Sequence, residues 1–68
     1  MWERFIDLIE YNRKQLAKAD GYNLCWTLMC QCYGAAYMFQ GTEQELAAIK
    51  VYETFVNEVK EKIAEVTK

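Results

Sequence analysis

The first part of the chain alternates apolar and polar residues with the period of an amphipathic helix. Between residues 2 and 19, apolar positions recur at spacings of three, four and seven, which places them on one side of a helix. They are Trp2, Phe5, Ile6, Ile9, Leu16 and Ala19. Asn12 falls on the same side, where an apolar residue would be expected. The Asp20-Gly21 pair that follows predicts the end of this helix.

The middle of the chain, from Gly21 to Thr42, contains no charged residue. In a helix over 22–40, the polar residues Asn23, Thr27 and Gln31 share one narrow stripe and apolar or aromatic residues surround it. A helix that is apolar around most of its circumference is either buried by neighbours or crosses a membrane. The polar residues and the short flanking turns argue against a membrane span. We therefore expect a central helix that is covered partly by another subunit.

The last part, 43–66, shows a strict heptad alternation of apolar residues, which predicts a third helix. Its apolar positions are Ile49, Tyr52, Val56, Val59, Ile63 and Val66. The preceding Thr42-Glu43-Gln44-Glu45 matches a capping box, in which Thr42 accepts from the amide of Glu45. At 1.5 Å per residue this helix would be about 36 Å long and would extend beyond the other two. Its last turns would then pack on the first helix or face water in a monomer, and would be covered by another chain in an oligomer.

These segments predict an all-α protein with a single helical domain over 1–68. The expected architecture is a small three-helix bundle, with helices over 2–19, 22–40 and 43–66, packed in an oligomer. A helical hairpin is the alternative, because one interior glycine costs a helix only about 1 kcal/mol relative to alanine. In that hairpin the first two segments form one long helix that ends near Gln40.

The small size of the chain indicates that it needs a partner. A domain this small buries only about 60% of its unfolded surface. Cys25, Cys30 and Cys32 are odd in number and crowded together, unlike a disulfide framework, and no signal peptide is recognisable. We expect free thiols in the cytoplasm and a homo-oligomer, most simply a two-fold dimer. The expected interface residues are Trp26, Tyr33, Gly34, Tyr37, Val59, Ile63 and Val66.

Charge and composition argue against several classes of function. The net charge is −2, and no basic field is present that would attract nucleic acid or an anionic membrane surface. The chain has no histidine, and no phosphate-binding, catalytic or metal-binding motif occurs in it. The cysteines cannot complete a zinc site from one helix. We therefore expect no enzymatic activity, no metal and no cofactor.

One polar cluster, Glu10 to Gln15, could bind a small ligand. Tyr11 could stack on a base, Asn12 could read its edge, and Arg13 and Lys14 could pair with phosphates. The plainer interpretation is an ordinary helix face on which Asn12 fixes the register of the bundle.

Two functional hypotheses follow from the sequence. The first is a non-enzymatic interaction protein: an adaptor, regulator or inhibitor of another macromolecule, most simply a protein, that works as a homo-oligomer. The alternative is an oligomer that binds or sequesters a nucleotide or another small molecule at Tyr11, Asn12, Arg13 and Lys14.

Overall fold

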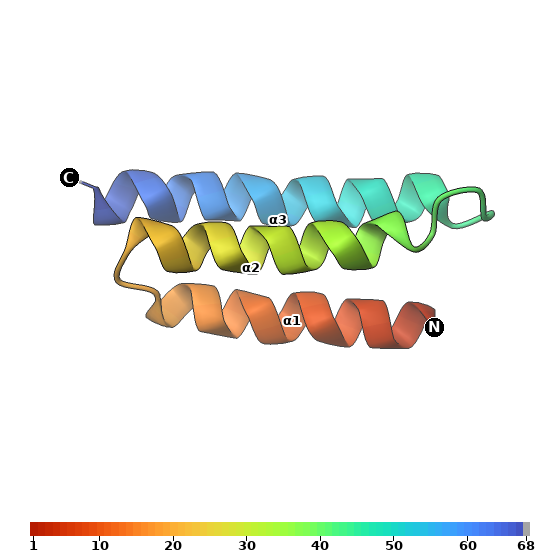
Figure 1. Ribbon diagram of the computed structural model, residues 1–68, viewed down its shortest axis with the longest axis horizontal. Coiled ribbons are helices and arrows are strands. Elements are labelled where there is room, and N and C mark those ends of the chain that lie inside the picture. Colours follow the sequence, from red (N-terminus) through yellow and green to blue (C-terminus); the bar gives the residue numbers. More distant parts are fainter. Residues whose placement is uncertain (68) are drawn as a thin grey trace.

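Three helices make up the computed structural model, which describes residues 1–67 (Figure 1). They are α1 (Trp2–Lys18), α2 (Tyr22–Tyr37) and α3 (Glu45–Val66). Each helix runs antiparallel to the one before it, and α2 lies between α1 and α3 in the view of Figure 1. The bundle is slender, with principal extents of 40 × 16 × 14 Å. The prediction of a small all-α three-helix bundle is confirmed.

The connection between α1 and α2 shows that they are separate helices. Ala19 has an extended backbone (ψ 136°) and its N–H donates to the carbonyl oxygen of Leu16 at 3.0 Å. Gly21 is extended as well, and α2 begins at the next residue. Ala19 is itself buried, so the sharp turn is held by packing in addition to the hydrogen bond. The alternative of one long helix through residue 40 is wrong.

The segment after α2 differs from the prediction, because α2 ends at Tyr37 and the next residues form successive turns. Phe39 turns inward and is buried. Gly41 reverses the chain with a φ of +82°, which among the described residues is the single positive value. Thr42 donates its hydroxyl proton to the carbonyl oxygen of Phe39 at 2.6 Å and accepts from the amide of Gln44 at 3.2 Å. The predicted capping box is wrong, since α3 starts only at Glu45 and Thr42 stabilises the turn instead.

Aromatic packing joins this turn to the beginning of α1. The ring centroids of Trp2, Phe5 and Phe39 lie 5.2–5.4 Å from one another. One buried stripe from each helix, together with one residue from each connection, fills the core of the bundle. These residues are Phe5, Ile9, Asn12, Leu16, Ala19, Cys25, Leu28, Cys32, Phe39, Ala48, Phe55 and Val59.

The inward face of α3 is rotated relative to the predicted heptad. Ala48 and Phe55 lie at its centre with no exposed surface, whereas Ile49 remains 41% exposed. Because α3 packs against α1 and α2 together, a residue between the two neighbours is covered better than one on either flank. Val59, expected at an interface, is fully buried within its own chain, while Ile63 and Val66 are partly buried.

The charge-free helix is too short to span a bilayer. A membrane-crossing helix needs about 20 apolar residues, and α2 has 16. Within residues 1–67, no helix has the length and hydropathy that a membrane span requires.

Replacing Phe39 with alanine should strongly destabilise the bundle. The change removes a fully buried ring that contacts α1, and such substitutions cost about 3–5 kcal/mol. Urea unfolding followed by circular dichroism measures this loss, with Met38→Ala as the matched control because Met38 is 66% exposed. A loss below about 1 kcal/mol for Phe39→Ala would contradict the packing of the turn on α1.

Candidate interaction surface

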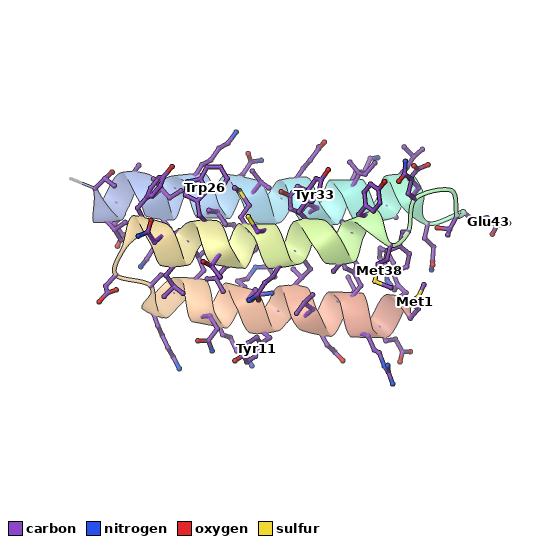
Figure 2. The ribbon with its side chains drawn as sticks, in the orientation of Figure 1. Met1, Tyr11, Trp26, Tyr33, Met38 and Glu43 are labelled. Atoms are coloured by element: carbon purple, nitrogen blue, oxygen red, sulfur yellow. The ribbon has the colours of Figure 1, made fainter. Side chains whose placement is uncertain are left out.

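Four aromatic residues of α2 lie in one row on the outside of the bundle. They are Tyr22, Trp26, Tyr33 and Tyr37, and we call this row the aromatic face. Their side chains are between 42% and 60% exposed. Because their spacings are four, seven and four, they stay on one side of the helix along its full length. In Figure 2, Trp26 and Tyr33 lie over the side of the bundle where α2 meets α3.

The rings of the aromatic face are ordered by one another and by α3. Tyr22 and Trp26 meet edge to face with centroids 6.0 Å apart, and Tyr33 stacks on Tyr37 at 6.3 Å. Tyr33 also meets Tyr52 of α3 edge to face at 5.6 Å. Rings held in this way lose little further side-chain freedom when a partner covers them, which favours binding.

The flank of α3 extends this surface. Tyr52 is half-buried and Ile49 is exposed beside Tyr37. The pKa of Tyr52 is raised, first by burial and then by the neighbouring thiols and the Tyr33 hydroxyl. A cleft of about 210 Å³ lies between α2 and α3 here. Because small-molecule pockets usually measure about 300–1,000 Å³, this cleft suits a side chain of a protein partner better than a whole ligand.

The seam between α1 and α3 has the opposite character and is charged. The Nε of Arg13 donates to both carboxylate oxygens of Glu58 at 2.9 and 3.1 Å, and its guanidinium also pairs with Glu10. These carboxylates raise the pKa of Arg13, and the hydrogen bond to Glu58 has the largest effect. Lys62 donates to the carbonyl oxygen of Ala17 at 3.3 Å, which ties the ends of α1 and α3 together.

The structure does not bring the predicted ligand-binding residues together. Tyr11 is 59% exposed on the outer edge of α1 (Figure 2), while Asn12 has no exposed surface. Arg13 is held by its two carboxylate partners, and Lys14 is exposed. Four consecutive residues of one helix point in four directions, so these side chains do not converge on a ligand.

Asn12 and Cys32 form a polar contact inside the core. Asn12 Nδ2 donates to Cys32 Sγ at 3.3 Å, and Asn12 Oδ1 has no hydrogen-bond partner. Burial raises the pKa of the Cys32 thiol to about 11, although the hydrogen bond from Asn12 acts in the opposite direction. Cys25 is equally buried, whereas Cys30 is exposed. In residues 1–67 no three potential metal ligands are grouped.

Of the predicted interface residues, Trp26, Tyr33 and Tyr37 lie together on the aromatic face. Gly34 is exposed on α2, and a Cβ added there would meet no atom within 4 Å. Tyr22 was missed by the sequence reasoning because it stands at the helix start. Its position four residues before Trp26 was the signal that could have identified it.

The comparisons with known proteins return no match to this chain, whether with protein-family models, curated proteins or solved structures.

Replacing Asn12 with leucine should stabilise the fold. An unsatisfied buried polar atom costs about 1–3 kcal/mol, and leucine keeps the branched shape of the asparagine side chain without its polar atoms. We expect the free energy of unfolding in urea to rise by about 1 kcal/mol. Asn57→Leu, at an exposed position of α3, controls for the better helix propensity of leucine. A marked loss of stability in Asn12→Leu alone would show that the amide is needed in the core.

Stability should fall between pH 9 and 11 because of Cys32. In this range the thiol ionises in the unfolded chain, from its ordinary pKa of 9.0, but stays protonated in the folded state, where its pKa is about 11. The unfolded state then binds fewer protons, so stability decreases as pH rises. Relative to Cys32→Val, the wild type should lose on the order of 2 kcal/mol over this range. Parallel stability curves for the two proteins would contradict the assignment.

Proposed function

We propose that the protein is a non-enzymatic interaction protein that works as a homo-oligomer and self-associates through the aromatic face. One observation carries this proposal: α2 exposes four aromatic side chains along its whole length and contains no charged residue. Aromatic residues are enriched and charged residues depleted at the centres of protein interfaces. In this proposal the assembled protein acts as an adaptor, regulator or inhibitor of another protein.

The contrast between the two exposed aromatic sites of the bundle supports the proposal. Tyr11 is a single exposed ring on α1 between charged neighbours, as expected for an ordinary solvated helix face. The aromatic face instead gathers four exposed rings on one side of α2, in two contacting pairs. Isolated exposed apolar residues are common on proteins, whereas a contiguous patch marks an interaction site. The alternative function, nucleotide binding at Tyr11 to Lys14, gains no support because those side chains diverge.

Light scattering on a sizing column under reducing conditions tests the proposal. The wild type should elute as a species of about 16 kDa or more, a multiple of the 8.0 kDa chain. Tyr33→Lys should lower the mass to that of one chain, because it places a charge in the interface that would have to be desolvated. Tyr11→Lys is the matched control, since it changes an equally exposed tyrosine on α1 and should leave the mass unchanged.

The helical content of each variant, measured by circular dichroism, confirms that the fold is intact. A wild type that remains a single chain at high concentration would contradict self-association. An equal effect of Tyr11→Lys and Tyr33→Lys would contradict the aromatic face as the binding surface.

A further inference from the structure

The spacing of the residues in the aromatic face is symmetric about the middle of α2. Tyr22, Trp26, Tyr33 and Tyr37 are separated by four, seven and four residues. The centre of this pattern falls between Met29 and Cys30, which is also the midpoint of α2. Met29 is half-buried and Cys30 is exposed, so this centre has no bulky charged side chain to obstruct a partner.

A symmetric spacing of this kind suits an antiparallel two-fold contact, because it places rings of one copy opposite rings of the other. In such a contact, residue i of one copy meets residue j of the other, and j meets i. With the axis at the centre of α2, Tyr22 lies opposite the partner's Tyr37, and Trp26 lies opposite the partner's Tyr33. Large rings therefore meet large rings at all four positions. A parallel pair would bring each residue against itself and would need no symmetric spacing.

We propose that a second copy of this chain covers the aromatic face, with α2 packed antiparallel on α2 about a two-fold axis at Met29 and Cys30. This inference rests on the proposed function, because it specifies the partner and the geometry of the homo-oligomer. It also accounts for the absence of charge on α2, because a charged side chain at the centre of the interface would lose its water with no opposite charge on the other copy's α2 to pair with.

The charges on α3 are complementary in this arrangement. Tyr33 of α2 contacts Tyr52 of α3, and the two helices are antiparallel. Counting back along α2 from Tyr33 to its centre therefore corresponds to counting forward along α3 from Tyr52, which places the centre of α2 level with Phe55 and Val56. The axis then brings α3 opposite the partner's α3, again antiparallel. Glu53 lies about 4 Å along α3 on one side of this level and Lys60 about 7 Å on the other.

The two-fold operation therefore brings Glu53 within about 3 Å, measured along the helix axis, of the partner's Lys60. Both residues are exposed, and their spacing of seven puts them on the same edge of α3. In this arrangement two equivalent ion pairs, related by the two-fold axis, lie at the rim of an uncharged centre, as in typical protein interfaces.

The available area is sufficient for a stable dimer. A standard interface buries about 800 Å² on each partner, which is about one sixth of the 4870 Å² that the chain exposes. One long side of a bundle with three long sides provides this area. The charged seam between α1 and α3 stays in solvent.

Chemical cross-linking at Cys30 tests the position of the axis. Cys25 and Cys32 have no exposed surface, so a short bis-maleimide reacts in the folded protein at Cys30. We expect a single covalent dimer from the wild type and none from Cys30→Ser. The matched control is Cys30→Ser with Lys14→Cys, which moves one exposed thiol to α1 and should give no dimer beyond random collision.

A charge exchange at the rim tests the orientation without changing an aromatic residue. Glu53→Lys should raise the dissociation constant several-fold, because both ion pairs become like-charge contacts. Adding Lys60→Glu in the same chain should restore the dissociation constant of the wild type, because both ion pairs form again with their charges exchanged. If Glu53→Lys acted only by destabilising the fold, the second substitution would not restore binding.

The outcomes separate this inference from the proposed function. Cross-linking through Cys30 together with rescue by the double variant supports the antiparallel dimer. An oligomer that does not cross-link at Cys30, or that cross-links equally through Lys14→Cys, overturns the geometry but leaves self-association intact. A single chain in light scattering overturns both, and a different protein would then have to cover the aromatic face.

Discussion

A helix that packs against two neighbours buries the stripe facing them and leaves the rest of its circumference open. This constraint governs the whole structure, because every helix of a three-helix bundle has two neighbours. On α1 and α3 the open part carries charged residues, and ion pairs such as Arg13 with Glu58 join the two helices. On α2 the open part carries aromatic residues and no charge. The bundle therefore has one long side with a different character from the others.

The core contains a polar contact between Asn12 and Cys32, which bears on the register of α1 and α2. Asn12 and Cys32 lie where α1 and α2 face each other, inside both helices. A buried amide that is only half-satisfied is costly unless the helices keep one register, because any slip would remove its single partner. The packing of Phe39 on Trp2 and Phe5 holds the turn after α2 against the start of α1, at one end of the bundle. The register of α1 and α2 is thus fixed inside the helices, and the turn after α2 is fixed at the end of the bundle.

Much of the fold could be predicted from periodicity, since hydrophobic spacing reports directly on which side of a helix is buried. Phe5, Ile9 and Leu16 were expected inside and are buried. The end of α2 could not be predicted, because Gly41 alone marks the reversal while the inward turn of Phe39 depends on a contact with α1. The rotation of α3 could not be predicted either. Centring it on Phe55 instead of Ile49 requires both neighbours to be in place.

The sequence by itself determined the three helices, the absence of charge on the second and the aromatic spacing along it, since these depend only on residue types and on the helical repeat. The tertiary structure alone decided which residues are available for binding. It buried Val59 and Asn12, engaged Arg13 with two carboxylates, and left the aromatic row of α2 exposed. The physical reason is that burial depends on how helices distant in sequence are rotated against one another. That rotation cannot be predicted from the hydrophobic periodicity of a single helix.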